Sequence, residues 1–145
     1  MSVRIAVSLL LLLALTGCAD DRREERLRAA GPRPTLQALL KVADASVGAR
    51  KFRQCAGCHT ISKGAPDTGG PNLHGIFGQE FGRNSARFGY TAALRDTGRR
   101  WDAQTLDAWM ENPQKVVPGT TMQFGGMADP LDRADLIAYL RSRSD

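Results

Sequence analysis

The chain has 145 residues, 42% of them hydrophobic and 24% charged, and its 20 Lys and Arg against 15 Asp and Glu give a formal net charge of +5 at pH 7. This length suits one domain of ordinary size with additional segments, and the apolar share is normal for a globular protein. The positive excess is too small to indicate nucleic-acid binding, and three cysteines, Cys18, Cys55 and Cys58, do not make the even-numbered, widely spaced set of a disulfide framework.

Residues 1–17 have the layout of an export signal peptide. One positive charge on Arg4 precedes an apolar run over residues 5–15, which is well short of the roughly 20 residues that a membrane-spanning helix needs. Leu15-Thr16-Gly17-Cys18 then resembles the lipobox of bacterial lipoproteins, which implies cleavage before Cys18 and lipid attachment to it. An ordinary signal cleaved nearby and an uncleaved short anchor are the alternatives.

Residues 18–43 are predicted to be a lipid-anchored flexible tether. From residue 19 to 34 the composition is mainly Asp, Glu, Arg, Ala, Gly and Pro, with almost no large apolar side chain. Such a stretch buries too little apolar surface to offset the entropy of ordering. Four apolar residues between 36 and 43 recur at helical spacing, which predicts either a short helix before the domain or a contact with a partner.

Residues 44–145 are predicted to form a single domain of helices and long loops. Three helices are expected, each preceded by an aspartate that can cap it: Asp44 before a helix to about residue 55, Asp102 before one to residue 112, and Asp129 before the last helix. Residues 61–90 are rich in glycine and proline and have no helical period, which indicates a loop packed on a large rigid cofactor. No stretch alternates with period two, so the predicted fold class is all-α.

Cys55-Ala56-Gly57-Cys58-His59 is the C-x-x-C-H pattern of covalent haem attachment. On one helical turn, two thiols three residues apart reach the two vinyl groups along one side of a porphyrin, and the adjacent imidazole reaches the iron. A thioredoxin-like redox pair does not need the histidine, and a zinc site needs ligands beyond this motif and His74. The motif therefore predicts one covalently attached haem c with His59 as an iron ligand.

A six-coordinate haem needs a second axial ligand, and the sequence offers four candidates: His74, Met110, Met122 and Met127. Met122 is favoured because it follows a loop of rigid and permissive residues, Pro118 and Gly119, that suits presenting a thioether inward. Met127 is the near competitor, Met110 lies in a helical pattern, and His74 lies in a loop. A thioether ligand raises the reduction potential.

These motifs resemble those of the class I cytochromes c of mitochondria and bacteria, in the same order and spacing from about residue 44 to 143. The segments that carry the resemblance, besides the haem-attachment motif, are Gly70–Gly78, Tyr90-Thr91, Trp101, Glu111–Pro113, Pro118–Met122 and Asp135–Leu140.

The resemblance implies the cytochrome c fold, a single haem-binding domain in which the N- and C-terminal helices cross at Gly48. It also implies that the carbonyl of Pro71 holds the axial histidine, and that Tyr90 and Trp101 bond a haem propionate. Trp109 departs from the family pattern, because it stands where mitochondrial members often have a tyrosine near the methionine sulfur. Glutamine and threonine replace several lysines of the family's docking ring, so the usual partner surface does not carry over to this chain.

We therefore expect a monohaem c-type cytochrome that carries single electrons between redox partners outside the cytoplasm, with the iron ligated by His59 and Met122. No arrangement of acid, base or nucleophile indicates an enzyme. The alternatives are a haem subunit of a larger membrane oxidoreductase complex and a haem-based site for a small ligand or peroxide. The expected form is a monomer, held by lipid on Cys18 at the periplasmic side of a bacterial membrane, with an oxidase, a reductase or a periplasmic dehydrogenase as partner.

Overall fold

The computed structural model describes residues 22–144, so the predicted signal peptide (residues 1–17) and the lipid site at Cys18 lie outside it. Short helices joined by long loops make up the described chain: α1 (Arg23–Ala30), α2 (Leu36–Lys41), α3 (Ala45–Lys51), the 3-10 helix η1 (Phe52–Gln54), α4 (Ala92–Arg95), α5 (Ala103–Glu111), α6 (Pro113–Val116) and α7 (Pro130–Ser142). Residues 22–144 contain no β-strand, and no helix among them is long and apolar enough to cross a membrane. The predicted all-α class is confirmed.

The three predicted caps are present. The carboxylate of Asp44 accepts the first free N–H groups of α3, and that of Asp129 does the same for α7, where Pro130 takes the first helical position. Asp102 and Thr105 form a reciprocal capping box at the start of α5. The helix expected from Asp44 to about residue 55 is α-helical only to residue 51 and continues as η1.

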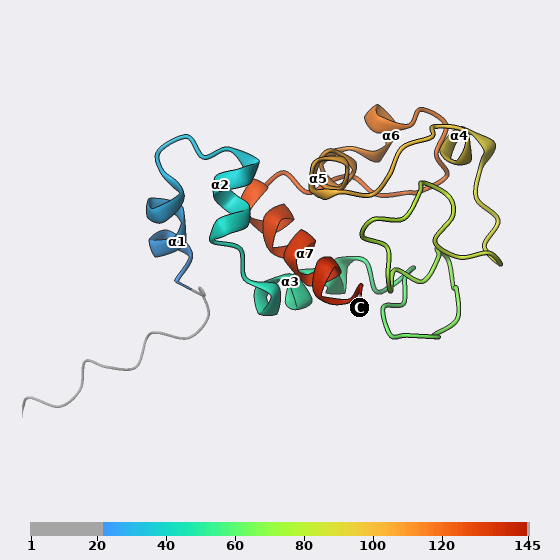
Figure 1. Ribbon diagram of the computed structural model, residues 1–145, viewed down its shortest axis with the longest axis horizontal. Helices are drawn as coiled ribbons and strands as arrows, with labels where there is room; N and C mark the ends of the chain where they lie inside the picture. The colour runs from blue at the N-terminus through green and yellow to red at the C-terminus, as the bar shows by residue number, and fades with distance from the viewer. Residues whose placement is uncertain (1–21, 145) are drawn as a thin grey trace, which may run out of the picture.

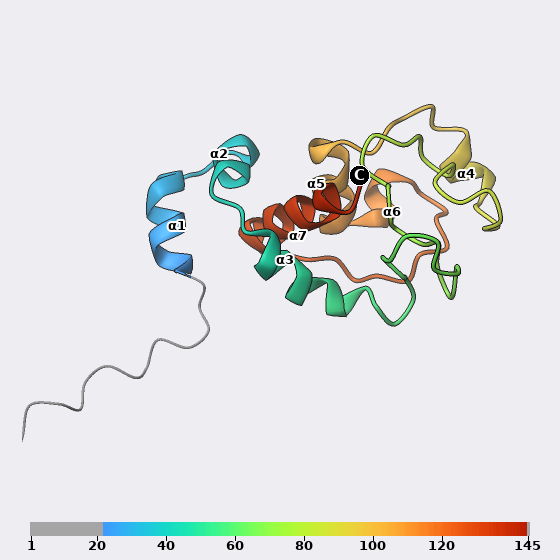
Figure 2. The ribbon, with the colours of Figure 1, turned by 60° about the horizontal axis from the view of Figure 1, so that its bottom comes forward.

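Helices α3 and α7 cross at Gly48, as predicted. A Cβ atom on Gly48 would lie 2.0 Å from the carbonyl oxygen of Asp135 and 2.8 Å from the Cβ of Tyr139, so only glycine allows this approach. Beyond the crossing, the rings of Phe52 and Tyr139 pack with their centroids 5.7 Å apart. Figures 1 and 2 show α3 running beside α7, with α5 on the other side of α7.

The main core lies between α5, α7 and the loops that precede α5. Phe81 stacks on Trp101 with ring centroids 3.6 Å apart, and Trp109 of α5 packs edge-on against both rings. The long segment between η1 and α4, predicted as a loop over residues 61–90, contains no helix or strand and folds around the end of the molecule that carries α4 (Figure 1). Its backbone is held by turns and side-chain bonds instead of by helices.

Residues 22–43 differ from the predicted flexible tether. They form α1 and α2, and both helices dock on the core domain at the start of α7 (Figure 2). Leu39 is 1% exposed and packs with Leu131 and Ala134 of α7. The short helix expected between 36 and 43 is present as α2.

Ion pairs explain the docking of α1, whose composition offers little apolar surface. Arg23 pairs with both Asp129 and Asp132, and Arg26 pairs with Asp135 while its Nε donates to the carbonyl oxygen of Val42 at 2.9 Å. Composition alone could not indicate these ion pairs, because the acidic partners lie more than a hundred residues away in the sequence.

Candidate functional site

A cavity of ≈ 280 Å³ lies between the crossed helices, α5 and the irregular loops. Its walls are mostly apolar, and they include Phe52, Leu73, Ile76, Leu94, Leu106 and Leu136. No Lys, Arg, Asp or Glu of the described residues lines it. The cavity is therefore a low-polarity space into which a small number of polar and sulfur-bearing side chains project.

Cys55, Cys58 and His59 enter this cavity from the turn that follows η1. The N–H of His59 donates to the carbonyl oxygen of Cys55 at 2.9 Å, and the N–H of Cys58 donates to the same oxygen at 3.0 Å. Both thiols and the imidazole line the cavity. The helical arrangement that the motif predicts is therefore present.

The two cysteines are not bonded to each other, and their environment is unlike that of a redox pair. Burial raises the pKa of the Cys55 thiol to about 11, with a smaller contribution from the neighbouring Cys58 thiol. A redox-active C-x-x-C pair instead has a lowered thiol pKa. Within residues 22–144 no cluster of three or more His, Cys, Asp or Glu could hold a metal ion, so a zinc site lacks its further ligands as well.

His59 has one ring nitrogen bonded and the other available. Its Nδ1 lies 2.8 Å from the carbonyl oxygen of Pro71, so Nδ1–H donates to that carbonyl and the lone pair remains on Nε2. Burial lowers the pKa of His59, and the bond to Pro71 partly opposes this. The side chain is thus a neutral, oriented imidazole with a free lone pair, which is the state that binds a metal.

Gly70 is a functional residue that sequence reasoning did not single out. A Cβ atom at this position would lie 2.4 Å from Cε1 of the His59 ring, so a larger residue would displace the imidazole. The same loop is fixed by Asp67, whose carboxylate accepts from the N–H of Asn72 at 2.8 Å and from the hydroxyl of Ser85 at 2.7 Å. The glycine pair before Pro71 is the only sequence signal for this close approach.

The four candidates for a second ligand separate by position. Met122 lines the cavity, and its sulfur accepts a hydrogen bond from Nε1 of Trp109 at 3.2 Å. Met110 also lines the cavity but is a core residue of α5, 6% exposed. Met127 and His74 are not among the lining residues. Trp109 thus supplies a donor to the Met122 sulfur at the position where it departs from the family pattern.

Tyr90 and Trp101 also line the cavity. The hydroxyl of Tyr90 accepts from the N–H of Ser85 at 3.1 Å, and burial raises the pKa of Tyr90. Trp101 is 5% exposed and is held by its stack on Phe81. Both aromatic side chains are therefore fixed in the cavity wall by partners outside it.

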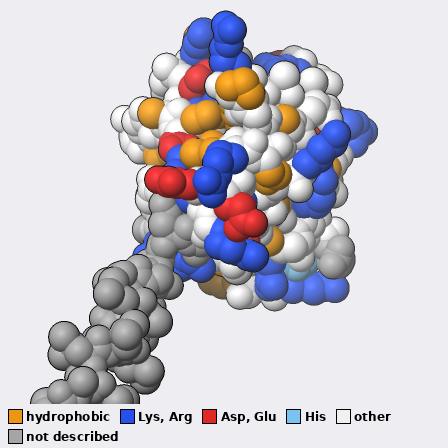
Figure 3. All heavy atoms as spheres, turned by 90° about the vertical axis from the view of Figure 1, so that its left-hand side faces the viewer, with side chains coloured by type: hydrophobic (Ala, Val, Ile, Leu, Met, Phe, Trp, Pro, Cys, Tyr) orange, Lys and Arg blue, Asp and Glu red, His pale blue; other side chains and the backbone are white. Residues whose placement is uncertain are grey.

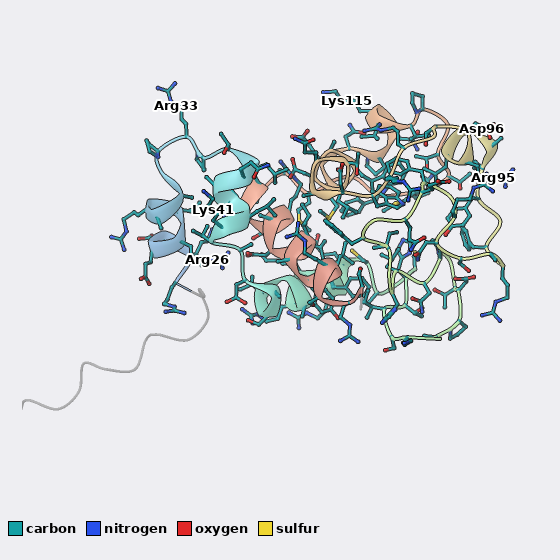
Figure 4. The ribbon with its side chains drawn as sticks, in the orientation of Figure 1. Arg26, Arg33, Lys41, Arg95, Asp96 and Lys115 are labelled. Atoms are coloured by element: carbon teal, nitrogen blue, oxygen red, sulfur yellow. The ribbon has the colours of Figure 1, made fainter. Side chains whose placement is uncertain are left out.

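Most charged side chains lie on the outside of the molecule, but Arg133 and Asp135 are buried. Figure 4 shows Arg33 and Lys41 at the end that carries α1 and α2, and Lys115, Arg95 and Asp96 at the end that carries α4 and α6. On the face seen in Figure 3, acidic and basic side chains are mixed with apolar ones. This mixture agrees with the small net charge, and no field of a single sign covers that face.

The donor set fits a covalently attached haem. Two thiols on one turn can form thioethers, a neutral imidazole offers Nε2, a thioether sulfur is present in the cavity, and apolar walls can enclose a flat aromatic macrocycle. The model of the Cytochrome c family matches residues 45–144. This chain belongs to the cytochrome c family.

Relatives support the same assignment. The chain is 36% identical over 133 residues to a "Cytochrome c homolog" of Bradyrhizobium diazoefficiens, an alignment that covers 92% of this chain and 72% of the relative. It is 46% identical over 99 residues to cytochrome c of Gossypium barbadense, covering 68% of this chain and 88% of that protein. Among solved structures, cytochrome cH from Methylobacterium extorquens matches with a TM-score of 0.65 and 37% identity, covering 69% of this chain and 99% of that one.

Membership has three direct consequences. The fold is the cytochrome c fold in a single haem-binding domain, as the sequence predicts. The cofactor is haem c, covalently attached, one per chain. Proteins of this family transfer electrons to redox partners, which is consistent with the expected electron carrier. The family match begins at Ala45, so α1 and α2 precede the matched domain.

Proposed function

We propose that this chain is a monohaem electron carrier in which His59 and Met122 hold the iron and Cys55 and Cys58 carry the porphyrin. The observation that supports the ligand pair most strongly is the state of the His59 ring. Its Nδ1–H donates to the carbonyl oxygen of Pro71, which leaves the Nε2 lone pair free to bind iron. Met122 is the cavity thioether outside a helix, and Trp109 fixes its sulfur. Bound there, haem supplies a one-electron ferric–ferrous couple.

The protein's own residues would do three things for that couple. Pro71 and Gly70 orient the imidazole, because the Pro71 carbonyl oxygen accepts a hydrogen bond from Nδ1–H and Gly70 leaves no room for the ring to tilt. Trp109 donates to the Met122 sulfur and restrains it. The apolar walls exclude water, and Tyr90 and Trp101 are the side chains that we assign to a propionate. If His59 and Met122 both held the iron, no coordination position would be left open for a substrate.

The visible spectrum of the holoprotein, with and without carbon monoxide on the reduced form, tests this proposal. We expect a low-spin spectrum that carbon monoxide leaves unchanged. Met122→Leu removes the sulfur at similar volume and should allow prompt carbon monoxide binding, whereas Met127→Leu is the matched control and should not. Prompt carbon monoxide binding by the unaltered protein would mean that one coordination position of the iron is open or labile. The proposal of an electron carrier would then give way to that of a small-ligand or peroxide site.

We further propose that the chain is exported and lipid-anchored through Cys18 on the periplasmic side of a bacterial membrane, where it exchanges electrons with other redox proteins. The support is the sequence pattern of residues 1–18. Incorporation of labelled fatty acid and recovery in the membrane fraction test it, with Cys18→Ser as the variant that should lose both. Label on the variant, or none on the parent, would contradict the proposal. A stable complex on gentle solubilisation would indicate a fixed subunit of a larger oxidoreductase.

A further inference from the structure

Arg133 is a buried cation that joins three segments. It lies on α7, is 6% exposed, and its Nε donates to the Asp107 carboxylate of α5 at 2.7 Å. Its Nη1 donates to the carbonyl oxygens of Met127 and Ala128 at 2.8 and 2.9 Å. The guanidinium therefore ties α7 and α5 to the end of the loop that carries Met122.

That loop, residues 117–129, contains no helix and is held at its two ends. At its start, the side-chain amide of Gln114 donates to the carbonyl oxygen of Thr120 at 2.7 Å. At its end, the N–H of Met127 donates to the carbonyl oxygen of Met110 at 2.7 Å. Between these ends, Trp109 holds the Met122 sulfur, so the place of that sulfur depends on where the two ends are fixed.

Arg133 is the charged hydrogen-bond donor at the C-terminal end of this loop, where it binds the carbonyl oxygens of Met127 and Ala128. Hydrogen bonds from an ionised donor are shorter and roughly twice as strong as neutral ones, and a guanidinium offers several donors in a fixed geometry. Without it, the carbonyl oxygens of Met127 and Ala128 lose the side-chain donor that the structure records for them, and Asp107 loses its partner. Of the bonds named for this end of the loop, only the one from the Met127 N–H to the Met110 carbonyl oxygen would still tie it to α5.

We propose that Arg133 is a positioning residue for the Met122 ligand: it closes the distal end of the loop and thereby keeps the sulfur at the iron. This inference rests on the ligand pair proposed above. It assigns no contact between Arg133 and the haem, because Arg133 is not among the residues that line the cavity. The charge acts through the backbone of residues 127 and 128.

The test measures the rate at which imidazole displaces the sixth ligand in the ferric holoprotein. Arg133→Gln should raise this rate roughly tenfold, the factor that corresponds to about 1.4 kcal/mol, and Arg133→Lys should restore part of the difference. The matched control is Ile137→Val on the same helix, a fully buried position that does not line the cavity. It lowers the urea midpoint of unfolding and should leave the imidazole rate within about twofold, since it keeps every loop contact.

Three outcomes decide the question. If Arg133→Gln and Ile137→Val have the same urea midpoint and the same rate of imidazole displacement, the inference is overturned, since Arg133 would then act only on global stability. If Arg133→Gln does not fold, Asp107→Asn keeps the arginine but removes its orienting carboxylate, and an unchanged rate there would overturn it equally. Met122→Leu is run in parallel, and if its rate equals that of the unaltered protein, the proposed ligand pair fails instead.

Discussion

Arg26 offers a direct test of whether the segment before the cytochrome domain is part of the folded structure. Its guanidinium lies 2.5 Å from Oδ1 of Asp135, a carboxylate that is 0% exposed, and the arginine side chain itself is 12% exposed. The only other donor recorded for that carboxylate is the N–H of Asp44 at 2.8 Å, and Oδ2 of Asp135 has no partner among the described residues. Arg26→Ala therefore leaves a buried charge with a single hydrogen bond.

Removing one partner of a buried ion pair costs about 3–5 kcal/mol. The lower end applies here, because Asp135 can take up a proton and so limit the loss. We expect Arg26→Ala to reduce the free energy of unfolding by about 3 kcal/mol near neutral pH, measured by urea unfolding of the holoprotein. Arg28→Ala, on an exposed position of the same helix, is the matched control and should stay within about 0.5 kcal/mol.

The pH dependence of the stability loss in Arg26→Ala provides a second test. Burial raises the pKa of Asp135 above its usual value of 3.8, and Arg26 opposes that rise. Without Arg26 the pKa of Asp135 rises further. A carboxyl with a raised native pKa contributes most stability below the unfolded pKa and loses it as pH climbs through the native value. The cost of Arg26→Ala should thus be smallest below pH 3.8 and grow towards neutrality. A cost under about 0.5 kcal/mol at neutral pH, or one that does not vary with pH, would refute a docked α1.

Three further predictions concern the domain itself. Gly48→Ala should lower the free energy of unfolding by at least about 1–3 kcal/mol, because its Cβ would lie 2.0 Å from the Asp135 carbonyl oxygen; thermal unfolding of the holoprotein measures this. Asp102→Ala should lower the free energy of unfolding by about 1 kcal/mol. The backbone N–H bond from Thr105 lowers the pKa of Asp102 below 3.8. The loss should therefore be present above this pH and fade as pH falls through the native pKa. Trp109→Phe keeps an aromatic ring but removes the donor to the Met122 sulfur, so imidazole should displace the sixth ligand faster, by roughly tenfold if the bond contributes about 1.4 kcal/mol; an unchanged rate would show that the bond does not restrain Met122.

What could be predicted from the sequence is what local chemistry determines. An aspartate before an apolar helical pattern caps that helix wherever it folds, and so the caps at Asp44, Asp102 and Asp129 were predictable. The haem-attachment motif is equally local, because the reach of two thiols and an imidazole is fixed by one turn of chain. Gly48 was predictable as a close approach, since a glycine in mid-helix costs about 1 kcal/mol and needs a compensating contact.

What could not be predicted depends on contacts between distant segments. The docking of α1 rests on Arg23 and Arg26, which meet aspartates of α7 more than a hundred residues away. A composition rule counts buried apolar area and therefore misses ion pairs of this kind. The contact of Gly70 with the His59 ring has only the glycine pair before Pro71 as a sequence signal, because it depends on how the loop folds back on the imidazole.

Helix α7 takes part in two buried ion pairs, Asp135 with Arg26 and Arg133 with Asp107. Their positions on the helix allow their effects to be measured separately. Residues two apart on a helix point about 160° away from each other, so Asp135 turns towards α1 and α3 while Arg133 turns towards α5 and the end of the methionine loop. The Asp135 side holds the preceding segment to the domain, and the Arg133 side holds the loop that presents Met122. Arg26→Ala should therefore lower stability and leave the imidazole rate unchanged, whereas Arg133→Gln should change the rate beyond its effect on stability. If the two variants shifted both quantities in the same proportion, α7 would act as one cooperative unit and the two clusters would have no separate roles.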